Sequence, residues 1–183
     1  KNLFTHLGAT ALSFEYGSQN NAIVDNEFND ISGSAIRIGE FHDTFIAPLA
    51  STWDARILVK DNLVDNNSIT KAGQEYHGSV GILIGYTDHT EVTRNEIQNL
   101  PYTGISLGWG WCNFETAVKN NKVKYNHIYD VMKVLNDGAG IYSLSRQDGT
   151  EISQNYIHDV GRGIEADWWA GNHGIYLDNG STN

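Results

Sequence analysis

Two aspartates stand beside copies of the same tripeptide near the end of the chain. Asp137 precedes Gly-Ile-Tyr in "NDGAGIYSL" (Asn136–Leu144), and Asp178 follows it in "HGIYLDNGST" (His173–Thr182). A pair of carboxylates can hydrolyse a glycosidic bond, one as general acid and the other as base or nucleophile. Aspartate is also common in turns, where its side chain bonds the nearby main chain. The elements that position the two residues must decide between these interpretations.

A short repeat runs through the chain and predicts those elements. Its first unit has the pattern V-x-x-N-x-Φ-x-x-[DN], where Φ is apolar and the first position varies. The central asparagines are spaced by 36, 33, 31 and 29 residues, and they are Asn26, Asn62, Asn95, Asn126 and Asn155. A second unit, small-Φ-x-Φ, begins at Ala11, Ala35, Gly81, Gly104, Gly140 and Gly174.

The repeat predicts an all-β fold, a right-handed parallel β-helix (a solenoid) of about six coils. Both units alternate apolar and polar residues, which is the period of a strand, and both are too short for helices. The gap between the units varies from 9 residues (Asn95 to Gly104) to 19 residues (Asn62 to Gly81), as a solenoid with outward insertions tolerates. We expect the recurrent asparagines to form an internal ladder. A propeller needs longer repeats, and a sandwich would show no such asparagine register.

The composition fits a single β-helix domain over residues 1–183. The chain is 40% apolar, and its 19 glycines and 2 prolines indicate many tight turns between short strands. The repeats reach both ends without a capping segment. We therefore expect a fragment of a longer β-helix, truncated at both ends, whose uncapped coils could associate end to end or edge to edge.

The charge and the metal-binding residue types narrow the partners. A formal net charge of −10 without a basic stripe argues against nucleic acid and anionic membrane surfaces. No apolar run approaches transmembrane length, and Cys112 is the only cysteine. No histidine pair has zinc-ligand spacing, so we expect no cofactor, with calcium bound by loop Asp and Asn as the alternative.

Alignment of the coils separates the scaffold from candidate chemistry. The last position of the first unit is always Asp or Asn, which predicts a turn role for Asp30, Asn66, Asn99, Asp130 and Asp159. At the position of Asp137 the other coils carry Gly, Ser or Pro, and at the position of Asp178 they carry Gly, Glu or Leu. The coil itself requires no carboxylate there. Asp137 and Asp178 are therefore the predicted catalytic residues.

Aromatic residues gather in the same half of the chain. Flat aromatic faces can stack on sugar rings, although tryptophan also serves simply to cover a solenoid face. Together with nearby polar groups they give the predicted substrate-binding residues, which are Trp109, Trp111, Tyr142, Glu165, Asp167, Trp168, Trp169, His173 and Tyr176.

Four motifs resemble bacterial right-handed β-helix glycoside hydrolases, most closely glycoside hydrolase family 141, which includes fucosidase and xylanase activities. They are "GISLGWGW" (Gly104–Trp111), "NDGAGIYSL" (Asn136–Leu144), "GTEISQNYIHDV" (Gly149–Val160) and "GIYLDNGST" (Gly174–Thr182). The resemblance covers about Asn95 to Asn183. It implies an oligo- or polysaccharide substrate, an extracellular or periplasmic location in a bacterium, and the same two catalytic aspartates. The family commonly has Glu after the second aspartate, where this chain has Asn179.

One geometric question and two other functions stay open. In-register strands would put Asp137 and Asp178 roughly 23 Å apart, more than the roughly 5–9.5 Å of a working pair. Either Asp137 lies in a turn that folds back, or the register differs, or Asp167 or Glu165 is the partner of Asp178. The alternative functions are a lyase of the pectate type, in which Arg37 is the only basic residue in the strands of the second unit, and a non-catalytic glycan-binding or adhesion solenoid.

Overall fold

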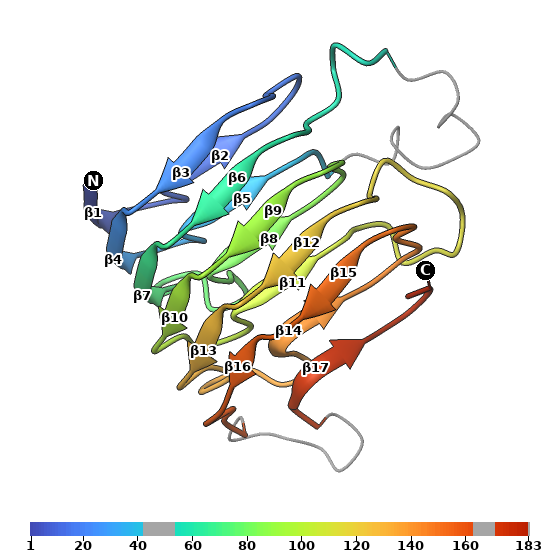
Figure 1. The fold of residues 1–183 in the computed structure, drawn as a ribbon. Coiled ribbons are helices and arrows are strands. Elements are labelled where there is room, and N and C mark those ends of the chain that lie inside the picture. Colours follow the sequence, from blue (N-terminus) through green and yellow to red (C-terminus); the bar gives the residue numbers. More distant parts are fainter. Residues whose placement is uncertain (42–53, 163–170, 183) are drawn as a thin grey trace.

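The chain winds into six successive coils of β-strands (Figure 1). This computed structural model describes residues 1–41, 54–162 and 171–182. Each coil contributes one strand to each of up to three sheets, and all pairings between these strands are parallel. The predicted right-handed parallel β-helix is therefore confirmed. Within the described ranges, no helix is long and apolar enough to cross a membrane.

Three sheets run along the axis of the coils. The first sheet contains β1 (Leu3–Leu7), β4 (Glu27–Ile31), β7 (Ser68–Ala72), β10 (Glu96–Gln98), β13 (His127–Tyr129) and β16 (Tyr156–Ile157). The second sheet contains β2 (Leu12–Phe14), β5 (Ile36–Ile38), β8 (Ile82–Ile84), β11 (Ile105–Leu107), β14 (Ala139–Ser143) and β17 (His173–Leu177). The third sheet contains β3 (Ala22–Val24), β6 (Leu63–Asp65), β9 (Glu91–Thr93), β12 (Lys122–Lys124) and β15 (Glu151–Ser153).

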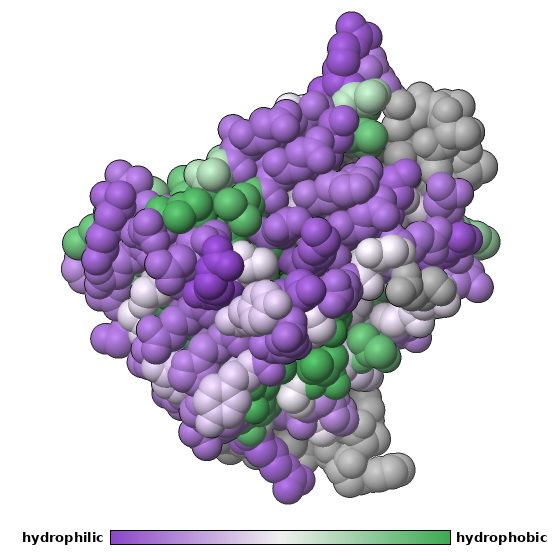
Figure 2. Space-filling view, viewed as in Figure 1, coloured by the Kyte–Doolittle hydropathy of each residue, from purple (hydrophilic) through white to green (hydrophobic). Residues whose placement is uncertain are grey.

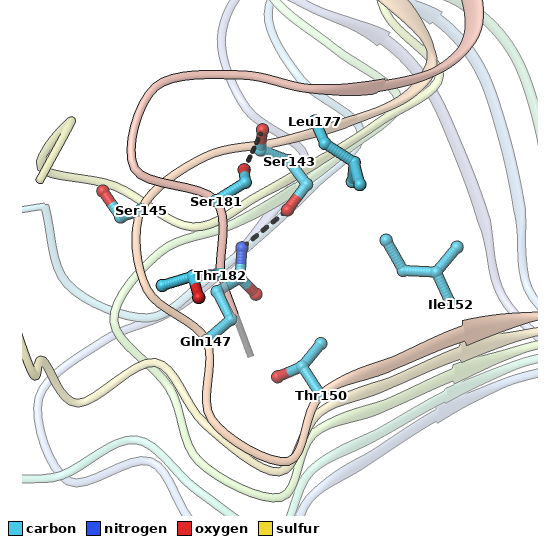
Figure 3. A pocket seen from close by; sticks show the side chains of 8 residues that line it. All are labelled: Ser143, Ser145, Gln147, Thr150, Ile152, Leu177, Ser181 and Thr182. Carbon is cyan, nitrogen blue, oxygen red and sulfur yellow. Dashed lines mark hydrogen bonds between the residues drawn. The ribbon is translucent and has the colours of Figure 1, made fainter. Parts of the chain in front are cut away.

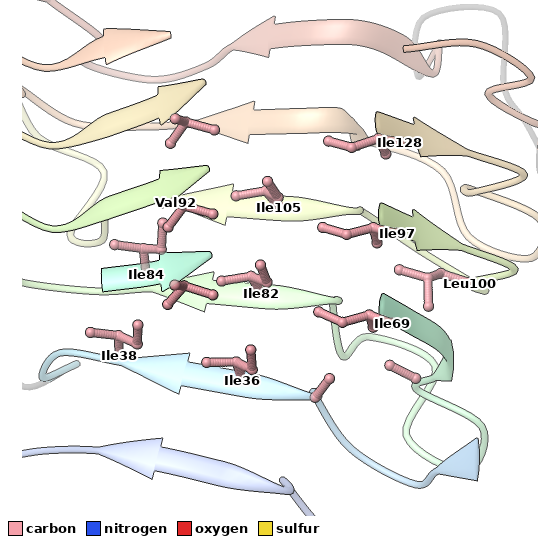
Figure 4. Packing of buried hydrophobic residues seen from close by; sticks show 14 of the residues in the cluster. Ile36, Ile38, Ile69, Ile82, Ile84, Val92, Ile97, Leu100, Ile105 and Ile128 are labelled. Carbon is pink, nitrogen blue, oxygen red and sulfur yellow. The ribbon is translucent and has the colours of Figure 1, made fainter. Parts of the chain in front are cut away.

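The core consists of apolar columns that run from coil to coil. Successive strand residues point to opposite faces, so the apolar positions of each unit all face inward. Figure 4 shows the stacked isoleucines between the sheets. Two fully buried columns are Phe28, Ile69, Ile97 and Ile128 in the first sheet, and Ile36, Ile82, Ile105 and Ile141 in the second.

An internal asparagine ladder exists, but one of its predicted members is wrong. The main-chain N–H and the side-chain amide of each asparagine donate to the side-chain oxygen of the next one, at 2.9–3.1 Å. Its rungs are Asn2, Asn26, Asn67, Asn95, Asn126 and Asn155. Asn67 occupies the place that the repeat assigned to Asn62.

Asn62 belongs to a second ladder at a different corner of the coil. Its side-chain oxygen accepts the main-chain N–H of Asn21 at 3.0 Å. Further along this corner, the oxygen of Asn121 accepts the main-chain N–H of Thr90 at 2.8 Å. Both corners carry the same local pattern, Asn-x-apolar. At each corner the asparagine directly precedes a strand whose second residue faces the core. The two patterns lie only five residues apart around Asn62 and Asn67, which explains the misassignment.

The last position of the first unit lies in a left-handed turn in all five residues, four of them at the expected corner. Asp30, Asn99, Asp130 and Asp159 have φ between 48° and 60°, the left-handed region in which Asp and Asn are favoured. Asn66 is also left-handed, with φ 53°, but it lies at another corner, one coil above Asp25. These aspartates and asparagines therefore shape the turns of the coil, as expected, and are not candidates for catalysis.

A column of small residues precedes the strands of the second sheet, and it leaves no room for a larger side chain at Gly81, Gly104 and Gly140. The carbon atom that Gly104→Ala adds would lie 2.6 Å from Cγ2 of Ile128 and 2.7 Å from the main-chain oxygen of Gly140. Since that oxygen belongs to the neighbouring coil, the backbone itself must shift. We expect Gly104→Ala to lower the free energy of unfolding by about 1–3 kcal/mol, measured by urea denaturation.

The matched control for this substitution is Gly174→Ala in the same column. Among the described residues, nothing lies within 4 Å of a β-carbon at Gly174. If Gly104→Ala and Gly174→Ala lowered the free energy of unfolding equally, steric contact with the neighbouring coil would not be the reason for glycine at position 104.

The outward face of the third sheet is polar. Figure 2 shows the face viewed in Figure 1 as mostly hydrophilic. Charged side chains of neighbouring coils pair across it, with Lys122 Nζ 2.7 Å from Glu91 Oε1 and Lys124 Nζ 3.0 Å from Glu151 Oε1. Such exposed pairs contribute little stability, so this face serves mainly solubility.

Candidate active site

A cavity of about 450 Å³ lies over the outward face of the second sheet. Its floor consists of outward side chains of β8, β11 and β14, and its walls come from the loops that flank these strands. The lining residues are Ser34, Gly78, Ser79, Val80, Leu83, Tyr102, Ser106, Trp109, Trp111, Asp137, Tyr142, Leu144, Asp178 and Asn179. Both predicted catalytic aspartates are among them. We call it the tyrosine cavity, because Tyr102 and Tyr142 each bond one of the two aspartates.

Asp178 is held at the end of β17 from two sides. Its main-chain N–H donates to the carbonyl of Ser143 at 2.8 Å. Its carboxylate accepts a hydrogen bond from the hydroxyl of Tyr142, an outward residue of β14 that is 9% exposed. Burial, and then the bond to Asp178, raise the pKa of Tyr142 well above its usual range. The phenol therefore stays protonated at neutral pH and acts as a fixed donor to the carboxylate.

Asp137 occupies a left-handed turn just before β14. Its φ is 61°, a conformation that Asp tolerates better than most residues. The hydroxyl of Tyr102 donates to its main-chain carbonyl at 2.7 Å, which anchors the turn. The carboxylate itself is exposed, and within the described residues no hydrogen bond anchors it. Asp137 thus combines a fixed backbone with a side chain open to the cavity.

The two strands are in register, yet both aspartates line one cavity. Ser143 pairs with Leu177, so Asp178 is level with Leu144, seven register positions beyond Asp137. Burial, then the charge of Asp137 and further that of Asp178, raise the pKa of Tyr102. Burial and the same two charges also raise the pKa of Tyr176. Both carboxylates therefore act on one group of tyrosines, from opposite ends of β14.

Two of the predicted tryptophans lie at the cavity. Trp109 and Trp111 contact each other edge to face, with ring centroids 4.7 Å apart. Trp109 is half-buried and packs edge-on against Phe41 at 5.2 Å, which fixes its ring. Trp111 is 51% exposed and presents apolar area to solvent beside the cavity. This pair offers the flat surface that a sugar ring requires.

The remaining predicted substrate-binding residues divide into two groups. Tyr176 contacts Tyr142 edge-on at 5.4 Å, and His173 lies 4.8 Å from the ring of Tyr176, but neither lines the cavity. The others lie outside the described residues, and they are Glu165, Asp167, Trp168 and Trp169.

Several residues that line the tyrosine cavity were not predicted from the sequence. Leu83 and Ser106 occupy the x position of the second unit, directly in register with Tyr142. That register could have identified them, since every x position faces outward on the second sheet. Tyr102 and Asn179 lie in loops of variable length, where the repeat carries no positional signal.

A second cavity, of about 220 Å³, has a different character (Figure 3). It lies beside β14 between Ile152 and Leu177, and it is otherwise lined by serine, threonine and glutamine side chains. Gln147 Nε2 donates to Ser143 Oγ at 2.8 Å, and Ser181 Oγ donates to the Ser143 carbonyl at 3.0 Å. Within the described part of the chain none of its lining residues is an acid or a base, whereas the tyrosine cavity contains two carboxylates.

Known proteins share this fold. A solved structure named "Glycoside hydrolase" superposes with a TM-score of 0.77 and 28% sequence identity, over 98% of this chain and 34% of that chain. The chain thus spans about a third of the length of that protein. No curated protein matches the sequence. Residues 16–183 match the family described as "Right handed beta helix region". The chain therefore belongs to the right-handed β-helix family.

Proposed function

We propose that this protein hydrolyses glycosidic bonds of an oligo- or polysaccharide in the tyrosine cavity, with Asp137 and Asp178 as its catalytic carboxylates. The main support is that two acids which the coil does not require line one cavity beside exposed aromatic rings. The fold that the chain shares with a protein named glycoside hydrolase supports the same class of activity. We further propose that it belongs with glycoside hydrolase family 141, on the motifs that contain these two residues.

The two aspartates have environments suited to different tasks. Asp178 accepts the Tyr142 hydroxyl, which fixes its carboxylate in the position that a base or nucleophile requires. Asp137 has an exposed side chain at the same cavity, and we assign it the role of the acid. The protonated acid donates to the glycosidic oxygen as the bond to the sugar breaks, and the ionised partner acts on the opposite face of the ring.

We further propose inversion rather than retention of the anomeric configuration, because inversion tolerates the wider separation of the two carboxylates. A retaining pair is only about 5–5.5 Å apart, whereas an inverting pair stands about 6.5–9.5 Å apart with a water between. Asp137 and Asp178 approach the cavity from opposite ends of a five-residue strand. We expect the first product seen by proton NMR to have the anomeric configuration opposite to that of the substrate. A product of unchanged configuration would require the closer, retaining arrangement.

A screen of plant and host glycans tests the proposed activity. We expect new reducing ends that form without calcium and without unsaturated sugars. Calcium-dependent unsaturated products would instead indicate a lyase, and binding without turnover would indicate a glycan-binding solenoid. The surroundings of Arg37 do not favour the lyase, because its guanidinium lies 3.6 Å from Glu15 Oε1 and 4.4 Å from the Phe41 ring centre. A lyase base must be free to take a proton from the sugar.

Tyr142→Phe should reduce turnover without changing the fold. It removes the hydroxyl that donates to Asp178 but keeps the ring in its outward place on β14. A hydrogen bond to a charged group contributes about 1.5–3 kcal/mol, which corresponds to about a 10- to 150-fold loss in kcat. Because the raised pKa keeps Tyr142 protonated, we expect the same loss from about pH 5 to pH 9.

The matched control for this prediction is Tyr129→Phe. The hydroxyl of Tyr129 also donates to a carboxylate, Glu96 Oε1 at 2.9 Å, but on the first sheet rather than at the cavity. The Tyr129→Phe variant should keep full activity. If the two phenylalanine variants had equal activity, the bond to Asp178 would have no part in the reaction.

A further inference from the structure

Two histidines of neighbouring coils face each other on the outward side of the first sheet. His127 lies in β13, and His158 directly follows β16. The pairing of His127 with Tyr156 places the two imidazoles on a diagonal. Their Nε2 atoms are 2.8 Å apart. This pair belongs to a different sheet from the tyrosine cavity and has no part in the proposed hydrolysis.

The orientation of His158 is fixed by a carboxylate. Its Nδ1 atom lies 2.8 Å from Asp159 Oδ2, so this nitrogen carries the proton that Asp159 accepts. The lone pair of His158 is then on Nε2, the atom that faces His127. Histidines that bind metals are oriented in the same way, by a carboxylate on the ring nitrogen that does not bind the ion.

Two tyrosines hold the imidazole rings in place. Tyr156 stacks on His127 with centroids 4.9 Å apart and planes 13° apart. Tyr129 stacks on His158 with centroids 5.1 Å apart and planes 5° apart. Both histidines are part-buried by these contacts. The rings therefore lose little side-chain entropy when an ion binds, which is the advantage of a preorganised site.

The spacing of the two nitrogens distinguishes between types of metal ion. Imidazole nitrogens bind metals at about 2.0–2.1 Å. Two such nitrogens at a right angle are about 2.8–3.0 Å apart, and at a tetrahedral angle they are about 3.3 Å apart. The 2.8 Å between the Nε2 atoms is a hydrogen bond between the two rings, and an ion that binds both nitrogens must displace the proton that they share. Because this spacing is close to that of the right angle, a square-planar or tetragonal ion such as Cu²⁺ or Ni²⁺ requires the least movement of the rings.

We propose that His127 and His158 form a surface site for a tetragonal transition-metal ion, Cu²⁺ in the first place, with water completing its coordination. Acidic groups favour a cation here, since Glu96 is in register with His127 and Asp159 contacts His158. In the described part of the chain no three His, Cys, Asp or Glu side chains gather around one point, so the pair supplies two protein ligands.

Copper titration of the tag-free protein tests the site. We expect one Cu²⁺ per chain by isothermal titration calorimetry, with an electron paramagnetic resonance spectrum that shows two imidazole nitrogens. His127→Gln and His158→Gln should each weaken binding about tenfold or more and leave at most one nitrogen in the spectrum. The double variant should have about the same affinity for Cu²⁺ as either single variant, because one imidazole alone binds the ion poorly.

Two further variants separate this site from general copper binding. Asp159→Asn should weaken binding about 10- to 100-fold through the orientation of His158, and Asn99 shows that asparagine fits this turn. His89→Gln is the control, because the Nδ1 of His89 also contacts a carboxylate, Asp88 Oδ1 at 2.7 Å, but no second imidazole among the described residues bonds it. Unchanged affinity in the His127 and His158 variants, or a wild-type spectrum without two nitrogens, would overturn the proposal.

Discussion

Asp137→Asn and Asp178→Asn are each expected to lower kcat by about 10²- to 10⁴-fold or more on a polymeric substrate. Asparagine has almost the shape of aspartate but neither donates a proton as an acid nor accepts one as a base. General acid–base catalysis alone contributes about 10²–10⁴-fold. Because the two groups act on one bond, the double variant should be little slower than the slower single variant.

The structure indicates that both variants keep their fold. Asparagine tolerates the left-handed conformation of residue 137, and its side-chain oxygen can still accept the Tyr142 hydroxyl at residue 178. Circular dichroism and the unfolding midpoint should therefore match those of the wild-type protein. Asp130→Asn is the matched control, since Asp130 lies in a turn of the first sheet where the preceding coil has Asn99. It should retain full activity.

An activated substrate separates the roles of the two aspartates. A sugar with a good leaving group, such as a nitrophenol, needs no proton on its leaving oxygen. If Asp137 is the acid, Asp137→Asn should recover most of its activity on that substrate, while Asp178→Asn should not. Full activity of both variants on the polymer would exclude this pair. Full activity of Asp137→Asn alone would make Asp167 or Glu165 the partner of Asp178.

The coil architecture was predictable because the repeat records it at almost every strand. The column from Ala11 to Gly174 aligns in the structure as it does in the sequence, and at Gly81, Gly104 and Gly140 any larger residue meets the next coil. The asparagine ladder was only partly predictable. Asn62 and Asn67 both precede an apolar strand residue, and only the three-dimensional pairing of Asn67 with Asn26 separates the two corners.

The two acids of the candidate site were predictable from the sequence, but the residues that form the walls of its cavity were not. Asp137 and Asp178 stand out because the scaffold gives no reason for a carboxylate at either position. Tyr102 does not stand out, because it reaches the cavity from a loop whose length varies between coils. The shared cavity could not be predicted from register alone, which separates the two aspartates by seven positions. It depends on the left-handed turn at Asp137 and on the reach of the tyrosine side chains.

Asn126→Ala should be the most destabilising single substitution among those considered, at about 3–6 kcal/mol. Asn126 is fully buried, and its side-chain oxygen accepts two hydrogen bonds from Asn95, each of 3.0 Å. Its side-chain amide donates to Val92 O and to Asn155 Oδ1, both at 2.9 Å. Alanine leaves the Asn95 donors and the Val92 carbonyl without this partner in a dry interior, and each buried unsatisfied group costs about 1–3 kcal/mol.

A comparison of three asparagines tests whether the ladder, rather than asparagine itself, supplies this stability. Asn121 is equally buried but accepts one bond, from Thr90, and donates one, to Thr87 O at 3.0 Å, so Asn121→Ala should cost less. Asn113 is exposed, and Asn113→Ala should change the free energy of unfolding by less than about 0.5 kcal/mol. Urea denaturation should therefore rank the variants 126, 121 and 113. Since a domain has only about 5–15 kcal/mol in total, a ladder of this strength means that the amides hold the coils in register almost as much as the apolar columns do. Equal losses at positions 126 and 113 would leave the columns as the sole source of that register.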